Sequence, residues 1–207
     1  MALKKLKCCG TEDGGARKNA AERVFETARD LFYHRGVRAV GVDEIVNQAG
    51  VTKPSLYRAF ASKDDLVAAC LEESAREVRG SLDALLADTV DDPRERLRAI
   101  MRFHAAKMTS PDYRGCAMSN TAVEFPEPGH PGRNVIESCK AETRERLGSL
   151  TRQLPVADPD ALADGLVLIL EGAMASHHIF GSQGPSAMLV RTADALVDAY
   201  IESARVS

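Results

Sequence analysis

Apolar residues recur at intervals of three and four along most of the chain, which is the spacing of one face of an amphipathic helix. The pattern predicts helices over 16–34, 43–49, 52–60, 62–86, 92–108, 116–125, 134–154, 160–180 and 186–204. The predicted breaks are rich in glycine and proline; they fall at Gly36, Gly50, Ser110-Pro111, 125–133, 155–159 and Gly184-Pro185. We therefore expect an all-α fold of about nine helices.

Residues 42–66, VDEIVNQAGVTKPSLYRAFASKDDL, have the form of a helix-turn-helix. The first short helix ends at Gly50, a residue that adopts positive φ without steric cost. Leu56 and Phe60 give the second short helix one buried edge. Its outer side carries hydroxyls and cations within barely two turns: Thr52, Lys53, Ser55, Tyr57 and Arg58. Such a helix suits the DNA major groove, where its N-terminal residues contact base edges.

The distribution of charge supports a DNA partner, although the net charge of the chain is −3. Residues 1–63 hold 12 Lys and Arg against 7 Asp and Glu, a net of +5. Residues 64–207 hold 15 against 23, a net of −8. A basic segment carried by an acidic body indicates a nucleic-acid-binding module. Because the basic excess is modest, we expect strong binding to need two copies of the module.

At these residues the chain resembles the TetR family of bacterial transcriptional regulators. The resemblance covers roughly the first third of the chain and is carried by Gly36, the VDEI start at 42–45, Ala49-Gly50-Val51, Leu56-Tyr57-Arg58-Ala59-Phe60 and Ser62-Lys63-Asp64-Asp65-Leu66. Lys63 matches a family position that faces a DNA phosphate, at a helix start that favours anions. Gly41 stands where the family more often has Thr or Ser, so no hydroxyl contact is carried over there.

The resemblance implies a DNA-binding head at 16–62 and a regulatory body at 63–207, while residues 1–15 read as a flexible arm. The predicted helices 160–180 and 186–204 are the most apolar in the chain and carry small residues between the large ones. They suit either a core hairpin within one subunit or an interface with a second copy, and the resemblance favours a homodimer. Such a dimer would bind a palindromic double-stranded DNA operator through Thr52, Lys53, Ser55, Tyr57, Arg58 and Lys63.

We also expect a small-molecule effector to bind in the body and release the repressor from its operator. The candidate pocket residues are mostly apolar with a few polar groups, as small-molecule sites tend to be; they are Met101, His104, Met108, Met118, Asn120, Glu124, Met174 and His177. Methionines at helical spacing also suit a plain core. The sequence therefore leaves open a drug-like compound, a fatty-acyl or aromatic metabolite, or no effector.

Other functions find weaker support in the sequence. Redox sensing through Cys116 or Cys139 would need an exposed thiol of lowered pKa. A DNA-binding protein without an effector is a further alternative. Glu124, Glu171 and His177-His178 fit no catalytic or metal-binding motif, so we expect no catalysis, cofactor or metal. The five cysteines form no C-x-x-C pair, and no secretory signal or membrane-length apolar run is visible, which indicates a cytoplasmic protein.

Overall fold

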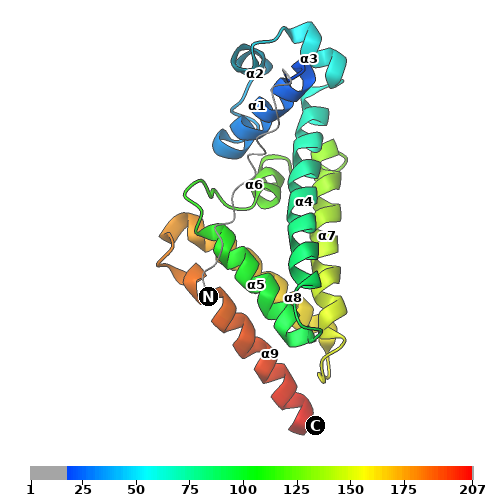
Figure 1. Cartoon of the computed structure of the whole chain (residues 1–207), viewed down its shortest axis with the longest axis vertical. Helices are drawn as coiled ribbons and strands as arrows, with labels where there is room; N and C mark the ends of the chain where they lie inside the picture. Colours follow the sequence, from blue (N-terminus) through cyan, green and yellow to red (C-terminus); the bar gives the residue numbers. More distant parts are fainter. Residues whose placement is uncertain (1–17, 207) are drawn as a thin grey trace.

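The computed structural model describes residues 18–206, so the arm expected at 1–15 lies outside the described residues. The described helices are α1 (Ala20–Arg35), α2 (Val42–Ala49), α3 (Lys53–Ala59), α4 (Lys63–Ala87), α5 (Pro93–Met108), α6 (Ala117–Glu124), α7 (Pro131–Thr151), α8 (Pro159–Phe180), the 3-10 turn η1 (Pro185–Met188) and α9 (Leu189–Val206). The predicted all-α fold is confirmed. Figure 1 shows α1, α2 and α3 at one end of an elongated molecule, with α4 and α7 side by side beneath them.

Side-chain caps explain where several helices begin. The Ser62 hydroxyl accepts a hydrogen bond from the Asp65 amide at 3.0 Å, and the Asp92 carboxylate accepts one from the Glu95 amide at 2.8 Å. Each cap satisfies an amide that a helix start leaves without an intrahelical partner. The starts expected at Ser62 and Asp92 are therefore confirmed.

The helices α1, α2 and α3 enclose a common apolar core in which Val24, Ile45 and Leu56 are fully buried. Gly36 ends α1 with φ of 85°, and Gly50 separates α2 from α3 in the left-handed conformation. This core continues without a break into α4, α6 and α7 through Leu66, Val67, Leu71, Met118 and Ile136. The head therefore shares its core with the upper body, and a domain boundary between residues 62 and 63 stays a prediction.

A second core fills the lower body, where α5, α7, α8 and α9 pack together with the end of α4. Met101, Leu147, Leu162 and Leu166 are among its most deeply buried side chains. Apolar packing between these helices therefore holds the lower half of the molecule together.

Several helix boundaries differ from the sequence prediction, among them the start of α1, which lies at Ala20 rather than at residue 16. Helix α7 begins at Pro131 rather than Asn134, because proline suits a first helical turn and the His130 ring nitrogen Nδ1 accepts from the Gly132 amide at 3.1 Å. It ends at Thr151 rather than Leu154. The last helix is preceded by the 3-10 turn η1, so α9 itself begins at Leu189 rather than Ser186. Within residues 18–206, no helix combines the length and apolar character required to cross a membrane.

Candidate DNA-binding surface and ligand cavity

The outer side of α3 presents the residues predicted to contact DNA. Leu56 is buried beneath the helix, which fixes the direction of the remaining side chains. Ser55 is half-buried, and the others on α3 and at its N-cap are exposed: Thr52, Lys53, Tyr57 and Arg58. Tyr57, with 49% of its surface exposed, is a large ring left in solvent at the end of the molecule. The arrangement can offer hydrogen-bond donors and two cations to a DNA groove.

Three of these polar groups have partners within the protein. The Lys53 ammonium lies 2.7 Å from the Asp43 carboxylate of α2, and that hydrogen bond raises the pKa of Lys53. The Thr52 and Ser55 hydroxyls lie 3.0 Å apart. Arg58 has no ion pair among residues 18–206. DNA binding through Lys53 would therefore exchange an exposed carboxylate for a phosphate or a base edge, which is a low-cost exchange.

Lys63 lies differently from the other predicted contacts. Its ammonium donates to the Val37 carbonyl at 2.7 Å and lies 5.8 Å from the centre of the Phe32 ring. Burial lowers the pKa of Lys63, and the Asp64 and Glu124 carboxylates offset part of that effect. A phosphate contact by this side chain would require release of the Val37 carbonyl, so that contact stays a prediction.

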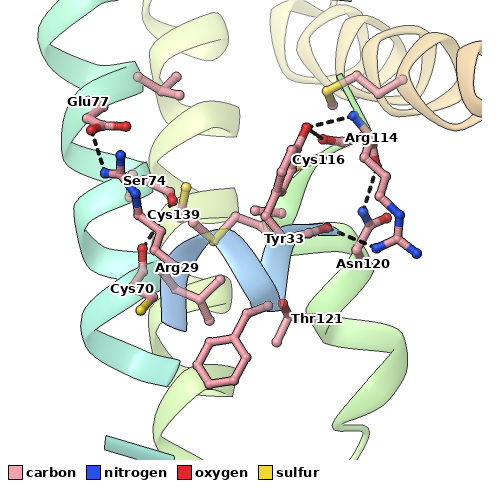
Figure 2. A pocket seen from close by; sticks show the side chains of 18 of the residues that line it. Arg29, Tyr33, Cys70, Ser74, Glu77, Arg114, Cys116, Asn120, Thr121 and Cys139 are labelled. Atoms are coloured by element: carbon pink, nitrogen blue, oxygen red, sulfur yellow. Dashed lines mark hydrogen bonds and ion pairs between the residues drawn. The ribbon is translucent and has the colours of Figure 1, made fainter. Parts of the chain in front are cut away.

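A cavity of about 480 Å³ lies between the head and the body. Its walls come from α1, from α4 and α5, from the segment 112–116, and from α6, α7 and α8. Figure 2 shows the Arg29–Glu77 ion pair, 2.7 Å long, at one side and the hydrogen bonds of Tyr33, Arg114 and Asn120 at the other. The volume is in the range of small-molecule sites. Because α1 forms one wall, a molecule in this cavity would contact the DNA-binding head directly.

A polar cluster centred on Lys140 of α7 lies at the body side of the cavity. Its ammonium lies 2.5 Å from the Glu171 carboxylate of α8, 2.9 Å from the Ser119 hydroxyl and 3.5 Å from the Cys116 sulfur. The Ser119 hydroxyl also donates to Glu171, at 2.9 Å. Burial disfavours the ammonium, but Cys116 and Glu171 outweigh that penalty and raise the pKa of Lys140. The cluster is therefore a satisfied ion pair within an apolar surrounding.

Two further polar side chains line the cavity near Glu171. Burial, with a smaller contribution from Lys107, lowers the pKa of His104 to about 4, so its imidazole is neutral at pH 7. Burial raises the pKa of Tyr113, whose phenol therefore keeps its proton. The Tyr113 hydroxyl is buried and has no hydrogen-bond partner among residues 18–206. Each of these groups is uncharged and able to donate a hydrogen bond.

The segment 36–41 between α1 and α2, which we call the α1–α2 turn, is held to α6 by one carboxylate. Glu124 accepts from the Val37 amide at 3.0 Å and from the Arg38 amide at 2.7 Å. Gly36 makes room for it, since a Cβ at that position would lie 3.1 Å from a Glu124 oxygen. Glu124 thereby joins the head to the wall of the cavity.

A second connection joins α1 to the segment before α6. The Tyr33 hydroxyl accepts from the Arg114 amide at 2.8 Å and donates to the Gly115 carbonyl at 3.2 Å. The Arg114 guanidinium donates to the Tyr33 carbonyl at 2.9 Å. Asn120 of α6 supports this segment by donating to the Arg114 carbonyl, at 2.9 Å. These bonds and those of Glu124 together form what we call the head–body clasp.

Three cysteines line the cavity, and Figure 2 labels all of them. Burial raises the pKa of Cys70 to about 12, and burial also raises the pKa of Cys139. Both groups are therefore protonated thiols at neutral pH and poor nucleophiles. Cys116 differs from them because the Lys140 ammonium lies 3.5 Å from its sulfur.

The structure brings five of the eight predicted pocket residues to the cavity: His104, Met118, Asn120, Glu124 and Met174. Within this set, Asn120 and Glu124 are already engaged in the head–body clasp. The other three lie elsewhere. Met101 and Met108 are buried in the lower core, and His177 bonds the Ser186 hydroxyl at 3.0 Å while its ring packs against the edge of Tyr113.

Sequence reasoning missed the polar residues that give the cavity its chemistry, namely Tyr33, Tyr113, Lys140 and Glu171. One signal was available for Glu171, because it is a charge within the most apolar helix, between Leu170 and Gly172. Such a charge is seldom buried unless paired. Lys140 carried a weaker signal, four residues after the buried Ile136 on the same face of its helix. No local pattern marks Tyr33 or Tyr113.

No group of three or more metal-ligating side chains is arranged to hold a metal ion within residues 18–206.

Residues 24–70 match the family model described as bacterial regulatory proteins of the tetR family. A crystal structure of a putative TetR transcriptional regulator from Streptomyces avermitilis is 33% identical, with a TM-score of 0.80 over 88% of this chain and 98% of that one.

Two further relatives match over a smaller share of the chain or at lower identity. The transcriptional activator FasR of Mycolicibacterium smegmatis is 34% identical over 119 residues, which are 56% of this chain and 53% of FasR. The chain thus spans about half the length of FasR in that match. The transcriptional repressor DhaR of a Mycobacterium species is 27% identical over 170 residues, which are 77% of this chain and 82% of DhaR.

Proposed function

Since this chain belongs to the TetR family of DNA-binding transcriptional regulators, we propose that it is a homodimeric repressor that leaves a palindromic operator when a small molecule fills its cavity. One observation carries this proposal: a single cavity is lined both by α1 of the head and by α6, α7 and α8 of the body. A ligand in this cavity would contact α1, which must move for DNA to be released, and also the body helices that would displace α1.

An apolar stripe on α8 supports dimerisation through the last two helices. Leu168, Gly172, Ala175 and Ile179 recur at helical spacing and are all exposed. Leu168 and Ile179 are each 73% exposed, and a Cβ at Gly172 would meet nothing within 4 Å. Exposed apolar surface of this kind marks protein interfaces, and a second copy of α8 could approach closely at Gly172.

The head–body clasp supports the release step. An effector changes DNA affinity only if it binds the two conformations of the protein with different affinity. Glu124 and Arg114 line the cavity and bond the head, so a ligand that displaces α6 or the segment 113–115 changes the position of α1. In a dimer this shifts the distance between the two copies of α3, which must match the spacing of successive major grooves.

Of the two relatives, DhaR matches over the longer part of this chain, and its name favours repression. DhaR is named a repressor, and its match extends over most of the body of this chain, where an effector would act. FasR is named an activator, and its match covers 56% of this chain. Repression is thus the better supported sign of regulation.

The function is tested by selecting bound sequences from a random DNA pool and measuring the affinity of variants for the selected site. We expect a palindrome with two half-sites. Lys53→Ala and Tyr57→Phe should weaken binding. Lys53→Ala should also lower the dependence of log affinity on log salt by about 2, because the dimer carries two copies of Lys53 and each would neutralise one phosphate. Lys107→Ala, on α5, is the matched control. Unchanged affinity and salt dependence in both α3 variants would contradict the assignment.

A second candidate function is thiol-based sensing through Cys116, favoured by the 3.5 Å contact with the Lys140 ammonium. Peroxide oxidises accessible cysteine thiols, and oxidation of Cys116 would disturb its contact with Lys140. In that case peroxide should release the operator from the wild type and from Cys139→Ser, but not from Cys116→Ser. Equal release from both serine variants would exclude Cys116 as the sensor.

A further inference from the structure

Arg114 is a half-buried cation of the cavity wall that no carboxylate of residues 18–206 neutralises. Its Nη1 donates to the Tyr33 carbonyl at 2.9 Å, and its Nε and Nη2 have no partner in the same part of the chain. These two nitrogens keep accessible surface, whereas the hydroxyl oxygen of the neighbouring Tyr113 is sealed in the wall. A partly desolvated cation without a counter-ion costs free energy, and a bound anion would reduce that cost.

The two nitrogens without a partner form one edge of the Arg114 guanidinium. Such an edge can donate two parallel hydrogen bonds to the two oxygens of one carboxylate. The chain shows this geometry elsewhere, because Nε and Nη2 of Arg144 donate to the two carboxylate oxygens of Asp164. Arg114 therefore presents the donors that a carboxylate needs, and Figure 2 shows it beside Tyr33 and Asn120 at one side of the cavity.

The three other Lys and Arg side chains that line the cavity are paired or exposed. The Lys140 ammonium and the Arg29 guanidinium each have a carboxylate partner, at 2.5 Å and 2.7 Å. Lys107 is exposed to solvent, where water and salt screen its charge. Arg114 is therefore the cation of the wall from which a ligand would gain most.

Six carboxylates also line the cavity, but five of them are engaged with groups of the protein. These five are Glu26, Glu77 and Glu171, which pair with a Lys or Arg, Asp30, which contacts His34, and Glu124, which accepts two backbone amides. The sixth, Asp112, is exposed to solvent. The described part of the wall thus offers a cationic ligand no buried carboxylate that lacks a partner, whereas it offers an anionic ligand the edge of Arg114.

Much of the remaining wall is apolar, formed by Phe32, Val67, Leu71, Met118, Leu170 and Met174. We propose that the cavity binds a mostly apolar molecule that carries one carboxylate, and that Arg114 is the counter-ion of that carboxylate. The apolar part of the ligand would be buried against the side chains just named, which supplies affinity that does not depend on charge.

A ligand bound at Arg114 would act on the head–body clasp. The Tyr33 carbonyl that Arg114 holds lies in the last turn of α1, the wall helix that belongs to the head. A carboxylate that draws the guanidinium toward itself competes with this bond and loosens α1. Release of DNA by this route rests on the proposed function, whereas binding of the carboxylate does not.

The test uses the full chain and three compounds of similar shape: 2-naphthoate, the uncharged 2-naphthamide and the cationic 2-naphthylmethylammonium. Binding is measured by calorimetry at one pH near neutrality. We expect 2-naphthoate to bind about tenfold more tightly than 2-naphthamide, the gain from a charge-assisted pair of hydrogen bonds that water partly screens. The ammonium compound should bind most weakly of the three.

Arg114→Gln should abolish the preference for 2-naphthoate while leaving the affinity for 2-naphthamide unchanged. Arg114→Met removes the charge with a different side chain and should do the same, so the test does not depend on the folding of one variant. Lys107→Gln removes the exposed cation of the cavity instead, and this matched control should retain the tenfold preference.

Four results would overturn the proposal. In the wild type, these are binding of 2-naphthamide or of the ammonium compound as tight as that of 2-naphthoate, and no binding of any of the three compounds up to their solubility limits. In the variants, they are a preference for 2-naphthoate that survives the loss of Arg114, and a preference that Lys107→Gln also abolishes.

Operator binding measured in parallel separates this inference from the proposed function. Preference for 2-naphthoate without any effect on DNA binding would uphold the ligand class and contradict effector-driven release. Tight operator binding together with equal affinity for 2-naphthoate and 2-naphthamide would contradict the ligand class and leave the DNA-binding function standing.

Discussion

His104 shows how a single residue of the cavity links pH to stability. Burial lowers its pKa to about 4, below the ordinary value of 6.5. At a pH between these two values, the imidazole of His104 binds a proton in the unfolded chain but stays neutral in the folded protein. The unfolded state is therefore favoured as the pH falls, and the penalty is absent above about pH 6.5.

We expect the free energy of unfolding to fall by about 2 kcal/mol more in the wild type than in His104→Gln between about pH 7 and about pH 5. The glutamine variant keeps a polar side chain of similar size and has no proton to take up. Denaturant unfolding at a series of pH values measures the difference. His178→Gln, on the exposed side of α8, is the control and should follow the wild type. Parallel curves for wild type and His104→Gln would show that the imidazole is not held neutral.

Single residues also show which side-chain positions the sequence specifies and which it does not. Thr52, Lys53, Tyr57 and Arg58 lie on the exposed side of α3 as expected, because a buried residue such as Leu56 determines which face of a short helix remains free. Lys63 does not follow this rule. Its long side chain turns back to the Val37 carbonyl, 26 residues earlier, and no local pattern specifies such a contact.

At the scale of elements, the sequence predicted where most helices lie, because local chemistry determines their ends. It did not predict which helices pack against one another. Caps such as Ser62 and Asp92 are visible in the sequence, since they act on amides three residues away. The start of α7 was misplaced by three residues because the Pro131 signal lay inside a stretch rich in proline and glycine. The clasp between α6 and the α1–α2 turn joins residues 86 and 87 positions apart, and periodicity carries no information at that range.

Glu124→Gln tests whether this clasp holds two elements together. A glutamine keeps one acceptor oxygen but turns an amide group toward a backbone N–H, which leaves one of the two donors without a partner. We expect the free energy of unfolding to fall by about 1.5–3 kcal/mol, the range for a hydrogen bond to a charged group. Operator affinity should fall as well, because α1 loses a point of attachment to the body.

Glu127→Gln is the matched control for this variant. Glu127 is exposed, lies three residues further along, and forms a 3.6 Å ion pair with Arg38. Its loss should change stability by less than about 1 kcal/mol, as is usual for a surface pair. Chemical denaturation measures the free energy of unfolding of both variants. Equal losses of stability would mean that the Glu124 carboxylate contributes no more than a surface charge.

At the scale of the whole molecule, the proposed function depends on two surfaces that a second copy of the chain would complete. The head offers one short recognition helix, and α8 exposes an apolar stripe that includes Leu168 and Ile179. The sequence predicted the recognition helix, but it left open whether the apolar content of 160–180 fills a core or an interface, and the family resemblance favoured the interface. It gave no information on which residues of that helix face outward. Leu168 and Ile179 do so because α5, α7 and α9 cover the remaining faces of α8.

Leu168→Glu should therefore convert the dimer to monomers without unfolding the subunit. In a two-fold interface the same patch occurs on both copies, so one substitution places two carboxylates opposite each other in apolar surroundings. Leu168 is 73% exposed in the single chain, so the thermal midpoint of the isolated subunit should change little. Val123→Glu, at 84% exposure on α6, is the control and should remain dimeric. Sedimentation velocity measures the mass of each variant, and operator affinity should fall steeply for Leu168→Glu because a lone head contacts one half-site. A dimer that survives Leu168→Glu, or one that both substitutions dissociate, would place the interface away from the α8 stripe.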